Sequence, residues 1–137
     1  MAIFRLASTP RAAMAAALIA DLDSESLPWY GKVYAGSMPA DITTAISGQT
    51  LLGTVTGSAD PSATNSGGLI TFNPITEDSA ADADGTASFM RIFKGDDSVW
   101  ADMDLGNLAS SATGKMNTTT VVTGGPIRIN AFTITVG

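Results

Sequence analysis

The stretch from residue 84 to residue 105, DGTASFMRIFKGDDSVWADMDL, decides the fold class of this chain. Its side chains alternate with a period of two on both sides of a polar reversal, Gly95-Asp96-Asp97-Ser98. Alternation around a Gly/Asp turn predicts a β-hairpin. On its first strand one face holds Phe89, Arg91 and Phe93, and the other holds Ser88, Met90, Ile92 and Lys94. On its second strand Val99, Ala101 and Met103 alternate with Ser98, Trp100 and Asp102.

Further short strands are predicted on both sides of this hairpin, separated by polar loops. Gly53 interrupts one of them, which indicates a bulge or a close approach of another segment. Seven short strands at spacings of about ten residues predict an antiparallel β-sandwich or a jelly-roll-like barrel. The other predicted strands are 32–36, 50–56, 69–72, 118–122 and 127–136, and the loops include 57–68, 73–84 and 106–117.

Residues 1–27 are expected to form a helical arm ahead of a β domain at 28–137. Thr9 can cap a helix that has Pro10 in its first position, and six alanines lie within 11–22. We expect one helix within residues 9–24, fraying near Asp23, where negative charge opposes the helix dipole. Pro28 prevents its continuation.

The apolar run at 12–20, AAMAAALIA, has nine residues, whereas a membrane-spanning helix needs about 20. No membrane partner is therefore predicted. The run is also similar to the apolar part of a signal peptide, but no small-x-small cleavage site follows it before Asp21. We expect the segment to be retained.

Composition argues against several classes of function. The 137 residues suffice for one domain with a core, and they carry a net charge of -6 with seven scattered basic residues. Nucleic-acid binders concentrate Lys and Arg, so no nucleic-acid partner is predicted. The chain has no Cys and no His, and therefore lacks the commonest general base and the commonest metal ligands. We predict a protein that is not an enzyme and requires no cofactor.

The acidic loop 78–85, DSAADADG, is the best candidate for a metal site. Oxygen ligands at alternating positions followed by a glycine are typical of calcium loops. An EF-hand would need a third carboxylate where Ala80 stands and a bidentate Glu where Arg91 stands. We predict a solvated turn here and no required metal, and leave calcium binding open.

The carboxylates of the hairpin, Asp96, Asp97, Asp102 and Asp104, invite a glycosidase hypothesis. Asp102 and Asp104 are two positions apart and would project from one strand face, as the acid pair of a glycosidase must. The sequence offers no cluster of aromatic residues as a sugar platform. The simpler interpretation is a strand edge protected by charge.

Five residues are candidates for binding a protein partner. Met14, Leu18 and Leu22 recur at helical spacing and would form one apolar stripe, although Leu18, Ile19 and Leu22 fit equally well. Trp29 and Tyr30 follow the helix, where burial in the core and contact with a partner are equally compatible with the sequence. The residues named as partner-binding are Met14, Leu18, Leu22, Trp29 and Tyr30.

From residue 32 to its end, the chain resembles a group of small virion structural proteins of tailed bacteriophages. The resemblance depends on the order of segments rather than on any one motif: a helical N-terminus, VYAGSMPAD at 33–41, TLLGTV at 50–55, DADGTASFMR at 82–91, DMDLG at 102–106, MNTTTVVTGG at 116–125 and a Thr/Ile-rich final strand. The sequence departs from the group at 94–98, where an Asp-Gly turn is expected. The group has no catalytic motif to transfer.

The resemblance implies a non-enzymatic structural role in the virion. The leading hypothesis is a capsid decoration, or cement, protein that binds the outer head surface as a homo-oligomer. Its expected partners are the major capsid protein or other virion proteins. The alternatives are a tail, baseplate or fibre component and, from another class, a carbohydrate-binding β-sandwich module.

Overall fold

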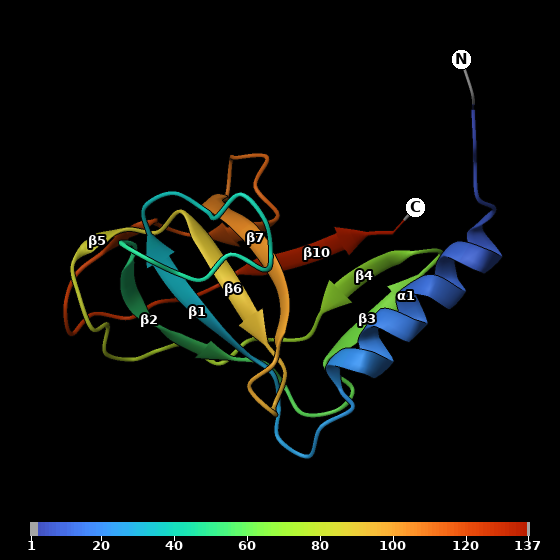
Figure 1. Ribbon diagram of the computed structural model, residues 1–137, viewed down its shortest axis with the longest axis horizontal. Helices are drawn as coiled ribbons and strands as arrows, with labels where there is room; N and C mark the ends of the chain where they lie inside the picture. Colours follow the sequence, from blue (N-terminus) through green and yellow to red (C-terminus); the bar gives the residue numbers. More distant parts are fainter. Residues whose placement is uncertain (1–2, 137) are drawn as a thin grey trace.

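The computed structural model describes residues 3–136 and contains a curled β-sheet with one helix at its far end (Figure 1). The eight-stranded sheet has the order β2-β1-β6-β7-β8-β10-β4-β3, and β5 pairs with β9 in a separate ribbon. The predicted mainly β fold with one N-terminal helix is confirmed. The elements are α1 (Ser8–Leu22), β1 (Tyr30–Ala35), β2 (Thr50–Thr56), β3 (Ala63–Ser66), β4 (Leu69–Phe72), β5 (Gly85–Thr86), β6 (Phe89–Phe93), β7 (Val99–Asn107), β8 (Gly114–Met116), β9 (Thr120–Val121) and β10 (Ala131–Thr135).

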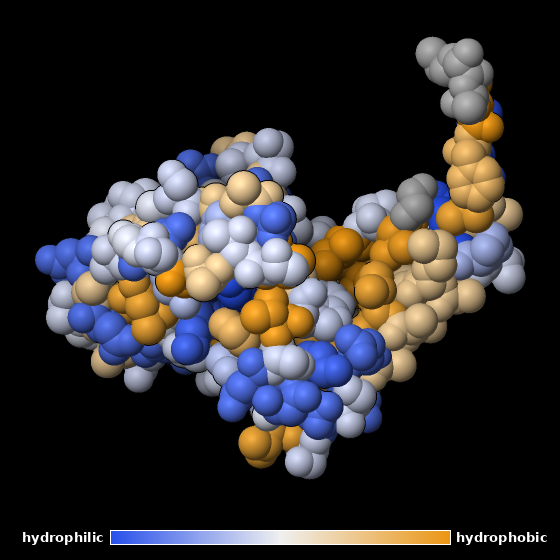
Figure 2. All heavy atoms as spheres, viewed as in Figure 1, coloured by the Kyte–Doolittle hydropathy of each residue, from blue (hydrophilic) through white to orange (hydrophobic). Residues whose placement is uncertain are grey.

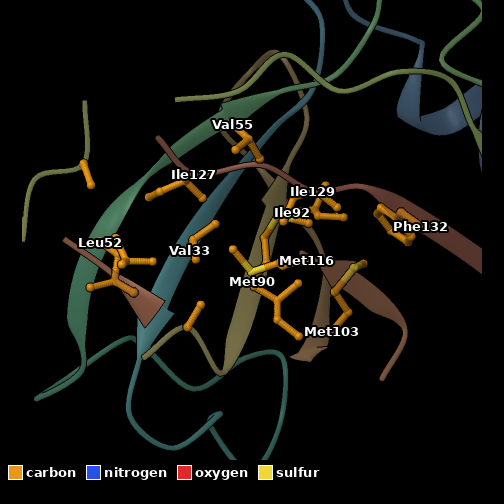
Figure 3. Packing of buried hydrophobic residues seen from close by; sticks show 14 of the residues in the cluster. Val33, Leu52, Val55, Met90, Ile92, Met103, Met116, Ile127, Ile129 and Phe132 are labelled. Carbon is orange, nitrogen blue, oxygen red and sulfur yellow. The ribbon is translucent and has the colours of Figure 1, made fainter. Parts of the chain in front are cut away.

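The concave side of the curled sheet encloses the main core (Figure 3). Val33 on β1 and Met90 and Ile92 on β6 are completely buried there. The segment between β9 and β10 closes the core with Ile127 and Ile129. Burying each such side chain contributes about 1.5–3 kcal/mol, so this cluster is the main source of stability for the β domain.

The predicted hairpin is present as β6 and β7, with Met90 opposite Met103. Its turn is closed by the Lys94 N–H, which donates to the Ser98 carbonyl over 2.9 Å, and Asp97 adopts a positive φ of 70°. Phe89 and Phe93 lie on the face of β6 opposite the main core, where Phe89 is nevertheless completely buried. There they stack on the β1 tyrosines, with ring centroids 5.2 Å apart in both pairs, because the register places Tyr34 opposite Phe89 and Tyr30 opposite Phe93.

Gly53 makes the predicted close approach. A β-bulge interrupts the pairing of β1 with β2 beside it, and a Cβ at this position would lie 2.7 Å from the Ile127 Cδ1 atom. Glycine therefore allows the segment that closes the core to lie directly on β2.

Two predicted loops contain strands. The segment 57–68 includes β3, which forms a hairpin with β4 through Gly67 and Gly68, at φ 59° and 99°. A two-residue turn with positive φ at both positions is the preferred hairpin closure, so this glycine pair is a strand-turn signal rather than part of a loop. The segment 106–117 includes β8, which pairs with β7 in the one parallel pairing of the described sheet.

The predicted strand 127–136 is divided. Ile127 and Ile129 are buried, and beyond Asn130 the buried set changes phase to Phe132 and Val136. The Asn130 N–H donates to the Lys115 carbonyl over 2.7 Å, and only residues 131–135 form β10. The first half of β10 pairs with β8 and the second half with β4, so one strand serves two parts of the molecule.

Candidate protein-interaction surface

Helix α1 packs on the β3–β4 hairpin, and only its last residue, Leu22, reaches the main core (Figure 1). Ala15 is fully buried there and forms a small second cluster with Ala63, Ile70 and Val136. The Asn65 side chain donates to the Ala12 carbonyl over 2.7 Å, which fixes the helix to the hairpin. Together α1, β3 and β4 form an arm that β10 connects to the β domain.

The helix begins two residues earlier than predicted. Ala7 is its N-cap without a side-chain hydrogen bond, so Ser8 is the first helical residue and Pro10 the third. Proline is tolerated there because the N–H groups of the first turn have no partner within the helix. The C-terminal end is as predicted, with Asp23 as the C-cap.

The sides of α1 that face away from the hairpin remain apolar and uncovered (Figure 2). Met14 is 46% exposed and Leu18 is 37% exposed. In the segment ahead of the helix, Ile3 and Phe4 are 71% and 83% exposed. A helix that is apolar on every side is normally buried on every side, so this surface is the best candidate for contact with another molecule.

The predicted stripe of Met14, Leu18 and Leu22 is divided between two environments. Leu22 is 1% exposed and belongs to the main core, and Ile19 packs against the small cluster. The face that docks is therefore Ala15, Ile19 and Leu22, while Met14 and Leu18 point elsewhere. Partner binding by the stripe stays a prediction. Of its three residues, only Met14 and Leu18 are exposed enough to touch a partner directly.

Trp29 and Tyr30 occupy different positions. Trp29 is buried and meets Phe72 and Phe132 edge to face, at centroid distances of 5.8 and 6.3 Å. Tyr30 is half-buried and donates a 2.7 Å hydrogen bond to Asp97. Burial and the neighbouring carboxylate raise the pKa of Tyr30 to about 12. Of these two candidates, only Tyr30 presents surface to a partner.

A shallow groove of about 400 Å³ runs between α1 and the start of β3. Ala16, Ile19 and Ala20 line its helix side, and Pro61 and Ala63 line its opposite side. These side chains are apolar, but Asp23, Asp60 and Asn65 also line the groove.

The acidic loop 78–85 uses its carboxylates to attach itself to the sheet. Asp78 accepts from the Thr54 N–H over 2.9 Å, and Asp84 accepts from the Thr123 N–H over 2.7 Å. The second hydrogen bond lowers the pKa of Asp84. Within residues 3–136, no three His, Cys, Asp or Glu side chains lie together in a way that could hold a metal ion.

The carboxylates of β7 also have structural partners. Asp102 forms an ion pair with Arg91 at 2.7 Å, and Asp104 accepts from the Thr113 N–H over 2.9 Å, which lowers the pKa of Asp104. Both acids line one shallow hollow beside β7, as two residues on one strand face should. Because Asp102 is paired with Arg91, Asp102 and Asp104 are not arranged as the acid and free base of a glycosidase.

Sequence reasoning missed the exposed residues Ile3 and Phe4 and the packing of Arg11 against the β3–β4 turn. The available signal was an Ile-Phe pair ahead of the helix, outside any predicted element. Arg11 lies against Gly68, its Nε is buried, and this atom has no hydrogen-bond partner among the described residues.

Comparison with known proteins gives no relative from which a function could be transferred. No protein-family model, curated protein or solved structure matches the chain. Among residues 3–136, no helix has the length and apolar character required to cross a membrane.

Proposed function

We propose that this chain is a non-enzymatic structural protein of a tailed-bacteriophage particle, and specifically a capsid decoration protein that binds the outer head surface through protein contacts. One observation carries the proposal: the apolar helix of the arm is covered on only one face, and its other sides remain exposed. The resemblance of residues 32–137 to small virion proteins supports the phage particle as the setting.

The shape of the molecule supports an assembly role. The main core lies within the β domain apart from Leu22 and Phe72, whereas most of the arm extends beyond it at the far end of the sheet (Figure 1). Ile3 and Phe4 extend this apolar surface past the helix. An arm of this kind can lie across a neighbouring subunit while the β domain rests on the head lattice.

The carbohydrate-binding alternative has less support. Trp29, on which a sugar platform would depend, is buried, and Trp100 packs against the main core. Phe4 is the most exposed aromatic side chain of the described residues. One exposed ring on an arm does not make a sugar-stacking surface.

Imaging of purified source particles by cryo-electron microscopy tests the proposal. We expect density for the β domain on the outside of the head. Density in the tail, baseplate or fibres would support the tail alternative instead. Purified particles without this chain would overturn a virion role.

A binding experiment tests the part played by the arm. Particles lacking the protein are mixed with the wild-type chain or with Ile3→Ser/Phe4→Ser, and the bound fraction is measured after sedimentation. We expect the variant to bind more weakly. Val122→Ser removes a side chain that is 61% exposed, outside the arm, and serves as the matched control that binds like wild type.

A further inference from the structure

Strands β7 and β10 are bridged by β8 over only part of their length. β8 has three residues, and it pairs with Leu105–Asn107 of β7 and with Ala131 and Phe132 of β10. Among the described residues, no strand continues β8 beside Ala101–Asp104 or beside Thr133–Thr135. The two open strand edges therefore flank a slot that continues the line of β8.

The slot has the width of one strand. Neighbouring strands lie about 4.8 Å apart, so two strands that flank a third are separated by about 10 Å. A hollow of about 420 Å³ occupies this place. Its lining comes from both sides and includes Met103 and Asp104 of β7, Ile134 of β10 and Met38 of the loop between β1 and β2. An extended peptide segment is the shape that such a slot accepts.

The first half of β7 turns backbone groups toward the slot. Successive residues of a strand direct their N–H and C=O groups to alternate edges. The Leu105 N–H donates to the Ser88 carbonyl over 2.9 Å, so every second residue counted back from Leu105 faces β6. The N–H groups of Asp102 and Asp104 face the opposite edge, which borders the slot.

The second half of β10 does the same from the other side. The Val136 N–H donates to the Gly68 carbonyl over 2.9 Å, so the even-numbered residues of β10 face β4. The N–H groups of Thr133 and Thr135 consequently face the slot. Unpaired groups along a strand edge are a template for pairing with another chain. A strand inserted here would form hydrogen bonds along both of its edges.

The two faces of the slot differ in polarity. Met103 and Ile134 belong to or pack against the main core, so they border the slot on its inner face. Asp104 is exposed and alternates with Met103, so it borders the outer face. The slot thus fits a strand with large apolar side chains at alternate positions and a basic side chain between them.

The segment ahead of α1 has this pattern. Its four residues, Ile3-Phe4-Arg5-Leu6, lie outside any helix or strand. In extended conformation Phe4 and Leu6 fall on one face and Arg5 on the other. Phe4 is 83% exposed, and the segment extends away from the body of its own chain (Figure 1).

We propose that Ile3–Leu6 of a second copy of this chain inserts into the slot as an added strand. Its two large apolar side chains cover Met103 and Ile134. Its arginine lies beside Asp104. Strand addition of this kind gains affinity from main-chain hydrogen bonds and specificity from alternate side chains. The contact is head-to-tail, and such contacts close into rings or extend into open chains.

This inference goes beyond the proposed function, and its test needs no phage particle. Sedimentation equilibrium of the full chain is expected to show association that increases with concentration. Phe4→Asp should weaken this association about ten-fold or more, because it places a charge against the inner face of the slot. Val122→Asp, at a side chain that is 61% exposed outside the arm, should associate like wild type. Equal association of Phe4→Asp and wild type would rule out this segment as the inserted strand.

A proline tests the slot itself. Thr133→Pro removes an N–H that faces the slot and not β4, and proline is tolerated where the N–H of a strand points to an open edge. We expect association to be lost while circular dichroism stays like that of wild type. Thr135→Pro, at the next N–H that faces the slot, takes its place if Thr133→Pro does not fold. A folded proline variant that associates like wild type would overturn the proposal.

Mixing the two variants distinguishes a head-to-tail contact from a symmetric one. Phe4→Asp retains an open slot, and Thr133→Pro retains an intact segment. At a concentration where wild type associates, each variant alone should be monomeric, and an equimolar mixture should form a heterodimer through one wild-type contact. A mixture as monomeric as its components would contradict strand exchange.

Arg5→Glu tests the charge match. We expect association to weaken roughly two- to five-fold, the usual range for an exposed ion pair, and the difference from wild type to shrink as salt is added. An Arg5→Glu chain that associates like wild type would show that Arg5 does not lie beside Asp104.

The two proposals fail in different ways. A chain that is monomeric at all concentrations and still coats particles would overturn strand exchange and leave the decoration function standing. Copies that exchange strands and never bind particles would support the slot and count against the decoration function.

Discussion

Arg91 and Asp102 lie directly opposite each other on β6 and β7 and form a doubly hydrogen-bonded ion pair, with distances of 2.7 and 2.9 Å. The third guanidinium nitrogen donates to the Thr44 carbonyl over 2.9 Å. Arg91 is 4% exposed, and its hydrogen bond with Asp102 raises its pKa. The pair therefore fixes the loop between β1 and β2 on the outer face of the sheet.

Asp102→Ala is expected to lower the free energy of unfolding by about 3–5 kcal/mol, because it leaves a buried guanidinium without its counter-charge. Arg91→Met/Asp102→Leu should cost less than this single change, since it removes both charges. Urea denaturation measures both. Arg128→Met, which breaks the exposed pair with Glu77, is the control and should stay within about 1 kcal/mol of wild type. Equal losses in Asp102→Ala and Arg128→Met would contradict the prediction.

Gly68→Ala should loosen the arm while leaving the β domain folded. Gly68 has a φ of 99°, and a Cβ there would lie 2.8 Å from the Arg11 Cβ atom on α1. We expect faster hydrogen exchange across Ser8–Leu22, with little change in β6 and β7. Gly67→Asn is the matched control. Asparagine tolerates the φ of 59° at this position, and a Cβ there would lie 3.6 Å from its nearest neighbour, the Ser8 Cβ atom. Unchanged exchange in Gly68→Ala would show that this contact does not hold the helix.

Gly57→Ala should destabilise the main core. A Cβ at this position would overlap the indole ring of Trp29, which is itself 1% exposed. Overpacking of this kind costs roughly 1–3 kcal/mol. Thermal unfolding followed by tryptophan fluorescence measures the loss, and exposed Ala59→Ser serves as the neighbouring control. A Gly57→Ala protein with the melting temperature of wild type would contradict the packing described for Trp29.

Tyr30 should ionise near pH 12 in the folded protein, mainly because burial disfavours its phenolate and also because of its hydrogen bond to Asp97. The unfolded chain loses this proton near pH 10, so stability should fall as the pH rises from about 10 to about 12. Spectrophotometric titration of a Tyr34→Phe protein isolates the Tyr30 signal. Asp97→Asn should move the titration to lower pH, and an unmoved curve would argue against the Asp97 contribution.

The sequence was sufficient for elements whose signal is local. The hairpin of β6 and β7 followed from alternation around a polar turn, and β2 and β4 have the predicted bounds. Gly53 was correctly interpreted as a close-approach position. In each case neighbouring residues determine the backbone conformation without reference to distant segments.

Features that depend on long-range packing were not predictable in this way. The parallel pairing of β8 with β7 involves three residues of a polar segment, which have no strand pattern of their own. The phase change at Asn130 occurs where β10 begins and pairs with β8, a strand distant in the sequence. Met14 and Leu22 share a helical period, yet Leu22 is buried in the main core and Met14 is exposed, which depends on segments distant from the helix.

The division of β10 between two neighbours has a mechanical consequence. A pull on α1 away from the β domain loads the chain segment 23–29 that leads into β1, and it also loads β10, whose first half pairs with β8 and whose second half pairs with β4 (Figure 1). Both pairings run along the strand, so tension shears their hydrogen bonds together instead of peeling them apart one by one. The stacked rings of Phe72 and Phe132, 4.0 Å apart, resist sliding at the same junction. The arm is thus attached as a tether able to bear load.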